Sequence, residues 1–160
     1  MHVFSVPWPY LLALVCSKHN DFFNVYSPRG VIQQTLCTEW HPSGEFFVTG
    51  DYGEFDAEGV ENVKLQFRNA DGKKIHEIAS GTKEYRNIRW SPDATQLASA
   101  SEALRIWSPE GYLISESEPS DDLLWGVDWS PDGKLIITSS RQGNIVLWDN
   151  KANKIQEMEY

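Results

Sequence analysis

The sequence repeats with a period of about 40 residues, and this period constrains the fold more than any other feature. Four short runs of alternating hydrophobicity each end in an aromatic residue, and the separations between these aromatics are 41, 40 and 41 residues. The four aromatics are Tyr26, Phe67, Trp107 and Trp148. Each is soon followed by a residue suited to the positive φ of a tight turn: Gly30, Gly72, Gly111 and Asn153. The pattern predicts four copies of one strand-rich unit.

A second motif, a tryptophan followed by a proline turn, recurs upstream of three of these aromatics. It reads WHPSG at 40–44, WSPDA at 90–94 and WSPDG at 129–133. Proline presets φ and glycine takes the left-handed corner, so each copy predicts a hairpin. The tryptophans of these turns are Trp40, Trp90 and Trp129, and Trp8 begins a degenerate first copy with a shorter turn. By this alignment the apolar run 10–16 is a buried strand. A signal peptide would need a positively charged residue before such a run, and no Lys or Arg precedes it.

Each unit is therefore predicted to be a sheet of four antiparallel strands that buries both faces against its neighbours. The expected units are residues 1–36, 37–80, 81–119 and 120–160. Gly, Pro, Asn or Asp interrupts every candidate for a long helix, and the hydrophobic period is two. We expect a single all-β domain.

The segments 104–108 (LRIWS) and 145–149 (IVLWD), together with the WSPDG turns, resemble the WD-repeat β-propeller family. The resemblance implies one propeller blade per unit and a function of holding proteins together. It also implies a hydrogen-bonded set in some blades that joins the Trp to a Ser or Thr of the second strand. The full set also contains a His and an Asp, and here it is incomplete: Ser101 with Trp107 and Ser140 with Trp148 are kept, but Gln142 stands where the Asp would be and Ser120 near the place of the His. We therefore expect these blades to depend on apolar packing.

Four blades span about half of the seven- or eight-bladed ring that the resemblance implies. An open half-ring would expose two apolar faces, which soluble monomers rarely tolerate. The simplest solution is a two-fold homodimer whose halves meet head to tail at both seams, giving eight blades. Three alternatives remain open: a closed four-bladed monomer, pairing with a different half-propeller, and a longer parent chain.

Candidate partner-binding residues follow from the resemblance, because family members commonly bind ligands at the start of each first strand and at the turn after the second. By position these residues are Phe4, Leu36, Glu84, Arg86, Leu123, Trp125 and Arg141. Aromatic and Arg side chains are the residues that binding hot spots favour. The alternative is that Phe4 and Trp125 pack between blades.

The second unit contains an insertion at 51–62 with five carboxylates and no Lys or Arg. Loops that lengthen on a rigid scaffold often carry function, and Tyr52 and Phe55 could engage a basic peptide there. Carboxylate oxygens could also bind Ca²⁺, although the ligand spacing of an EF-hand is absent. The possible ligands are Asp51, Glu54, Asp56 and Glu58. The alternative is a solvated acidic hairpin.

The net charge of -9 argues against binding to nucleic acid or to an anionic membrane, and favours a basic or neutral protein or peptide partner. Two cysteines form no disulfide framework, so we expect a reducing, cytoplasmic location. The sequence contains no recognisable catalytic motif, and we expect no cofactor. We also expect no zinc site from Cys16, His19, Cys37 and His41, because these residues fall in separate strands and turns. The predicted function is a non-catalytic interaction scaffold. The alternative is a ligand- or calcium-binding or hydrolytic propeller that uses the acidic insertion.

Overall fold

The computed structural model describes residues 25–26, 32–56, 59–81 and 83–159. Its body consists of three antiparallel sheets of four strands each, in the orders β3-β4-β7-β8, β12-β11-β10-β9 and β13-β14-β15-β16. Successive strands along the chain are neighbours in each sheet, apart from the β5–β6 insertion, as the repeat predicts. The predicted first unit lies almost wholly outside the described residues, Phe4 and Trp8 included.

The second sheet of the predicted series contains β3 (Thr35–Trp40), β4 (Phe46–Asp51), β7 (Val63–Asn69) and β8 (Lys74–Gly81). The third contains β9 (Asn87–Trp90), β10 (Leu97–Ala100), β11 (Leu104–Trp107) and β12 (Leu113–Glu116). The fourth contains β13 (Leu124–Trp129), β14 (Leu135–Ser140), β15 (Ile145–Asp149) and β16 (Lys154–Met158). Two short pairs accompany them: β1 (Val25–Tyr26) with β2 (Ile32–Gln33), and β5 (Glu54–Asp56) with β6 (Gly59–Glu61).

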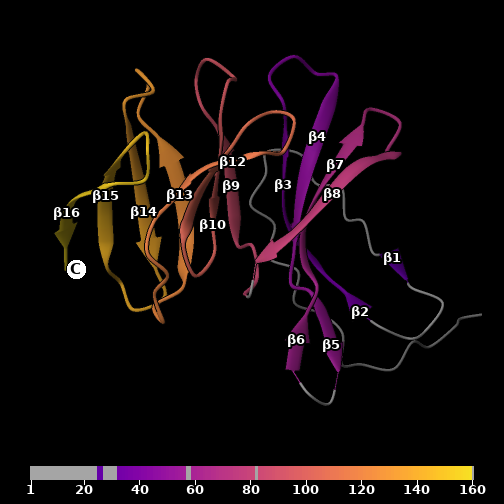
Figure 1. The fold of residues 1–160 in the computed structure, drawn as a ribbon, viewed down its shortest axis with the longest axis horizontal. Coiled ribbons are helices and arrows are strands. Elements are labelled where there is room, and N and C mark those ends of the chain that lie inside the picture. Colours follow the sequence, from indigo (N-terminus) through magenta and orange to yellow (C-terminus); the bar gives the residue numbers. More distant parts are fainter. Residues whose placement is uncertain (1–24, 27–31, 57–58, 82, 160) are drawn as a thin grey trace, which may run out of the picture.

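The three sheets stand side by side like blades, and the first strand of the third sheet, β9, packs against both β3 and β13 (Figure 1). Two apolar cores fill the spaces between them. One joins the second and third sheets, and the other joins the third and fourth sheets. Each sheet can form this way because both of its faces carry apolar side chains, which neither face could bury alone.

The turn residues that the repeat predicts can be compared with the residues that have positive φ in the structure. Gly72 and Gly111 have φ of 80° and 87°, as the sequence predicts. In the fourth sheet the prediction of Asn153 is wrong, because Ala152 takes that conformation with φ 62°. The Asn153 side chain instead donates a hydrogen bond to the Asp149 carboxylate. An Asp149 carboxylate that also accepts the Lys151 and Asn153 amides therefore closes this turn.

The predicted anchor Phe67 lies on the opposite face of its sheet from Trp107 and Trp148. Trp107 and Trp148 belong to cross-strand rows that begin at the turn tryptophan, namely Trp90–Leu97–Trp107 and Trp129–Ile136–Trp148. The matching row of the second sheet is Trp40–Phe47–Arg68. Since side chains alternate along a strand, a difference of one residue sends Phe67 to the other face, where it packs against the third sheet.

The rows on the other faces are Glu39–Val48–Phe67, Arg89–Ala98–Ile106 and Asp128–Ile137–Leu147. In the second and third sheets this row is covered by the next sheet, so Val48 and Ala98 are both 0% exposed. In the fourth sheet no described sheet follows, and Ile137 is 43% exposed. A shallow hollow of about 280 Å³ lies over Asp128 and Ile137. This row, 128–137–147, is called the open face below.

The serine partners predicted for the tryptophans are also wrong. The Trp107 indole N–H donates to Ser99 Oγ at 2.9 Å, and the Trp148 indole N–H donates to Thr138 Oγ1 at 2.8 Å. Each hydroxyl stands two residues beyond the strand partner of its Trp, within diagonal reach of a long side chain. Ser140 is two residues further away and instead accepts the Asn144 amide.

Candidate functional site: a rim surface and an inter-sheet groove

The first strands of the three sheets, β3, β9 and β13, are called the inner strands below. The rim surface comprises the predicted positions just before or at the start of these strands, together with one residue of the turn after β14: Leu36, Glu84, Arg86, Leu123, Trp125 and Arg141. Leu36 and Trp125 both stand at irregularities of the ladder, where the register shifts between β3 and β4 and between β13 and β14. A bulge re-aims a side chain out of its strand's alternation. Accordingly Trp125 is 46% exposed although it lies inside a strand.

Glu84, Arg86 and Trp125 come together on this surface across two sheets. The Arg86 guanidinium lies 5.3 Å from the centre of the Trp125 ring, which is a cation–π geometry. Its Nη2 and Nε also donate to Glu84 Oε1 at 2.7 and 3.1 Å. Because the Glu84 carboxylate is mostly buried, it fixes the guanidinium, which in turn presents the indole. The structure thus shows that Arg86 contacts both Glu84 and Trp125, whereas the sequence gives only their positions in the repeat.

Backbone hydrogen bonds hold the rim residues at the same height in successive sheets. The Tyr85 amide donates to the Asp51 carbonyl at 3.0 Å, and the Leu124 amide donates to the Ser101 carbonyl at 2.9 Å. Asp51 is the last residue of the second strand of the preceding sheet, and Ser101 directly follows the corresponding strand. The Arg141 amide donates to the Leu123 carbonyl at 2.8 Å, which ties the turn after β14 to the rim.

The remaining candidates lie outside this group. Phe4 is outside the described residues, and of Phe55 only its backbone pairing with Val60 in the β5–β6 hairpin is described. Leu36 and Tyr52 are half-buried and belong to the second sheet, Leu36 in β3 and Tyr52 directly after β4, whereas Trp125 belongs to the fourth sheet. Figure 1 shows the β5–β6 hairpin projecting at one end of the second sheet, away from the β13–β16 sheet.

The acidic insertion uses part of its charge within the fold. Asp51 Oδ1 accepts the Lys64 and Gly53 amides at 2.7 and 3.1 Å, and its side chain is buried. Burial raises the pKa of Asp51 to about 6, although these hydrogen bonds act in the opposite direction. Glu54 lies 4.0 Å from Lys64 Nζ. Within the described residues no three His, Cys, Asp or Glu side chains are placed to hold a metal ion; Cys16, His19 and Glu58 lie outside them.

Charged groups also line the inner strands at one repeat position. The Trp90 amide donates to Glu39 Oε2 at 3.0 Å, and Glu39 Oε1 lies 3.9 Å from Arg89 Nη1. The Trp129 indole N–H donates to the Arg89 carbonyl at 3.0 Å. Burial raises the pKa of Glu39 to about 7, against the opposing effects of Arg89 and the Trp90 amide. These bonds link each inner strand to the next.

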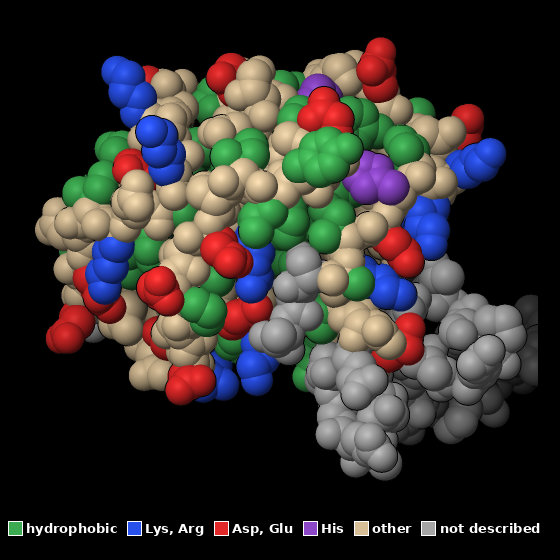
Figure 2. Space-filling view, viewed as in Figure 1, with side chains coloured by type: hydrophobic (Ala, Val, Ile, Leu, Met, Phe, Trp, Pro, Cys, Tyr) green, Lys and Arg blue, Asp and Glu red, His purple; other side chains and the backbone are tan. Residues whose placement is uncertain are grey.

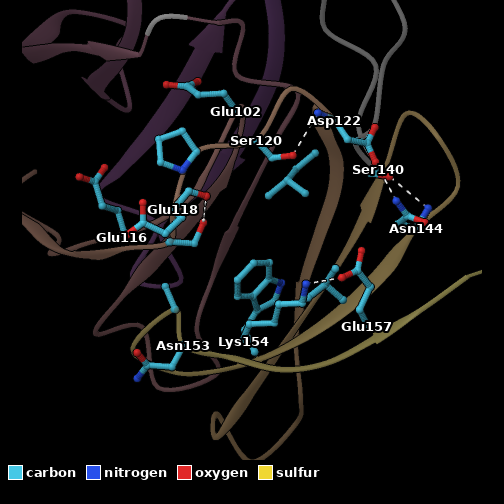
Figure 3. A pocket seen from close by; sticks show the side chains of 16 residues that line it. Glu102, Glu116, Glu118, Ser120, Asp122, Ser140, Asn144, Asn153, Lys154 and Glu157 are labelled. Atoms are coloured by element: carbon cyan, nitrogen blue, oxygen red, sulfur yellow. Dashed lines mark hydrogen bonds and ion pairs between the residues drawn. The ribbon is translucent and has the colours of Figure 1, made fainter.

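A groove between the third and fourth sheets is a feature that the sequence did not reveal. It has a volume of about 640 Å³, within the roughly 300–1,000 Å³ of typical ligand pockets. Leu124, Val146 and Trp148 contribute its apolar side chains. Its charged lining consists of five carboxylates, Glu102, Glu116, Glu118, Asp122 and Glu157, and one ammonium, Lys154. Figure 3 shows Glu116 and Glu118 on one side and Asp122 with Asn144 on the other.

Three of these carboxylates form ion pairs with two cations. Buried Arg105 donates from Nη2 to Glu102 Oε1 at 2.6 Å and from Nε to Glu116 Oε2 at 3.0 Å. Lys154 pairs with Glu157. Although burial alone would raise the pKa of Glu102, the hydrogen bonds from Arg105 and Ser101 lower it to about 2. The groove therefore keeps an excess of negative charge on Glu118 and Asp122.

Figure 2 shows Lys and Arg as well as Asp and Glu side chains spread over one face of the molecule, with hydrophobic side chains between them. The described part of the chain has no helix that is long and apolar enough to cross a membrane.

Comparison with known proteins supports the repeat. The family model of the WD domain, G-beta repeat, matches residues 111–149. The chain is 30% identical over 112 residues to protein transport protein sec13 of Aspergillus clavatus, covering 62% of this chain and 38% of that protein. It thus spans about two fifths of the length of that relative. The resemblance to WD-repeat proteins is confirmed by these matches.

Two further relatives are proteins of Mus musculus. Elongator complex protein 2 of Mus musculus is 26% identical over 112 residues, which is 60% of this chain and 14% of that protein. F-box-like/WD repeat-containing protein TBL1X of Mus musculus is 22% identical over 131 residues, which is 76% of this chain and 24% of that protein. The relatives thus include a protein transport protein and a protein of the Elongator complex.

Proposed function

We propose, starting from the WD repeat that this chain carries at residues 111–149, that it is a non-catalytic scaffold that binds a protein or peptide on its rim surface. The WD-repeat relatives include a protein transport protein and a complex subunit, which supports a role among protein partners. The absence of a catalytic motif in the sequence supports a scaffold over an enzyme. So does Cys37, since burial raises the pKa of its thiol to about 12 and keeps it protonated.

The observation that carries the rim proposal is the arrangement of Glu84, Arg86 and Trp125. A half-exposed indole held under a guanidinium, itself fixed by a buried carboxylate, is a rigid aromatic and Arg pair. Such pairs are enriched among the residues that dominate binding energy, because little conformational entropy is lost when a partner covers them. Leu123 and Arg141 extend the same surface.

We further propose that two copies of the chain complete a ring through their end sheets, in the cytoplasm. The support is the open face, whose equivalents in the two preceding sheets are fully covered by the next sheet. Ile137 occupies the position of Ala98, in the middle of a sheet, and an isoleucine there stays 43% exposed. Covering such a face with an apolar surface stabilises it by about 25 cal/mol per Å² of apolar area.

Replacing Trp125 tests the rim. We expect Trp125→Ala to weaken partner binding by roughly 30-fold, the effect of losing a hot spot of about 2 kcal/mol. The measurement compares proteins co-purified with the wild type and the variant by quantitative mass spectrometry, followed by titration of the recovered partner. Trp125→Ala should keep the fold, because the indole is half-exposed.

Tyr112→Ala is the matched control, since Tyr112 is a 73% exposed aromatic on the β11–β12 turn. It should leave the set of partners unchanged. Recovery of the same partners with the same affinity from Trp125→Ala and wild type would refute the rim proposal.

A further inference from the structure

We propose that the groove between the third and fourth sheets binds a basic peptide segment, with a Lys or Arg side chain inserted between the sheets. This site is separate from the rim surface and does not depend on the rim's function. It is lined mainly by the β12–β13 connection, β15 and β16, with Leu124 at the start of β13, and none of the rim residues lines it.

Charge complementarity sets the chemistry of the occupant. After the pairs with Arg105 and Lys154 are formed, Glu118 and Asp122 remain as groove carboxylates without a cation. Among the described residues Asp122 accepts only from neutral donors, the Gln142 amide at 3.0 Å and the Asn144 side-chain amide at 3.2 Å. For the Glu118 carboxylate, the described residues show no hydrogen-bond or ion-pair partner. An incoming cation would therefore find a carboxylate on either side of the groove and would displace no existing ion pair.

The apolar lining selects among cations. Trp148, Val146 and Leu124 supply a surface for an aliphatic stem, and Pro119 lies at the margin beside Glu118. Lys and Arg combine such a stem with a charged head that stays near polar groups. A bare metal ion would gain nothing from this apolar wall. A volume of about 640 Å³ admits the side chain together with the adjoining peptide backbone.

The groove walls are already rigid, which favours binding without reorganisation. The Ser117 amide donates to the Leu104 carbonyl at 2.9 Å, and the Leu104 amide donates to Ser117 Oγ at 3.1 Å. The Ser120 amide donates to the Glu102 carbonyl at 2.8 Å. These bonds fix the segment that carries Glu118 and Asp122 against the third sheet.

The test titrates the ¹⁵N-labelled full chain with a pool of hexapeptides that carry one central Lys or Arg among randomised neutral residues. We expect the indole N–H signal of Trp148 and the amide signal of Asn144 to shift with an affinity in the range of about 0.1–1 mM. The Trp125 indole signal reports on the rim and should move less. A pool with Gln at the centre should bind at least about tenfold more weakly, since a charge-assisted pair is lost.

The double variant Glu118→Gln/Asp122→Asn should bind the Lys/Arg pool about tenfold more weakly. The control Glu45→Gln/Asp71→Asn removes the same charge from exposed turns of the second sheet and should bind like the wild type. Each variant's own spectrum reports whether it is folded. Independently of any variant, raising the salt concentration should weaken binding to the wild type.

Four results would overturn the proposal: no shift at Trp148 with up to a few mM of the pool, equal binding of the Gln pool, equal weakening by the control variant, or shifts at Trp125 instead. Shifts of the Trp148 signal on diluting the protein alone would assign the groove to a second copy of the chain, and would overturn it as well.

Discussion

Trp107→Ala is expected to lower the free energy of unfolding by about 3–5 kcal/mol, the usual cost of deleting a fully buried large aromatic side chain. Trp107 is 1% exposed and packs in the core between the second and third sheets. The substitution also removes the indole N–H that donates to Ser99 Oγ. Urea unfolding followed by circular dichroism gives the change without relying on tryptophan fluorescence.

Two serine variants test whether the hydrogen-bond assignment is correct. Ser99→Ala leaves the buried indole N–H without an acceptor and should cost about 1–3 kcal/mol. Ser140→Ala removes only an acceptor for the Asn144 amide near the surface and should cost within about 1 kcal/mol. Equal costs for the two serines, or a near-neutral Trp107→Ala, would show that the core is not built around this tryptophan.

Arg105→Met is expected to lower the free energy of unfolding by a similar amount, about 3–5 kcal/mol, because it leaves Glu102 buried without its cation. Both side chains of this pair are 7% exposed. The double variant Arg105→Met/Glu102→Leu removes both charges and should recover much of the loss. If the double variant were as unstable as the sum of the two single variants, the pair would not act as a unit.

The same pair predicts a pH dependence of stability. The folded-state pKa of Glu102 is lowered from 4.5 to about 2. A lowered carboxyl pKa contributes stability above the unfolded pKa, and this contribution disappears as the pH falls from about 4.5 towards 2. In Arg105→Met the contribution is absent, so the stability difference between wild type and variant should shrink over this range. Parallel stability curves would contradict the assignment.

The repeat predicted the number and order of strands in the three described sheets, because strand period and turn chemistry are local properties. It failed where one residue decides the outcome. Phe67 matched the 40-residue spacing, yet cross-strand pairing places Arg68 in the row of Trp107 and Trp148. A shift of one residue reverses every side chain in a strand. Ser140 failed for a different reason: it lies on the same face as Thr138 but two residues further from the strand partner of Trp148, so Thr138 accepts the bond.

The rim residues could be aligned from the sequence, because they stand just before or at the start of the first strand of a sheet or in the turn after its second strand. What alignment could not supply was the contact of Arg86 with Trp125, which depends on how two sheets pack. The groove was not predicted, since its lining comes from segments between residues 102 and 157 that meet only in the fold. The available signal was the run 116–122, which has four carboxylates and no Lys or Arg.

The open face gives the most direct test of the scaffold account, through the mass of the protein in solution. Light scattering of the purified chain should give twice 18.3 kDa if two copies meet at their end sheets. Ile137→Glu should return the mass to one chain, because it places a charge on the open face, whereas Ile155→Glu, at an exposed residue of β16, should not. A wild-type mass of 18.3 kDa, unchanged on concentration, would contradict assembly through the end sheets.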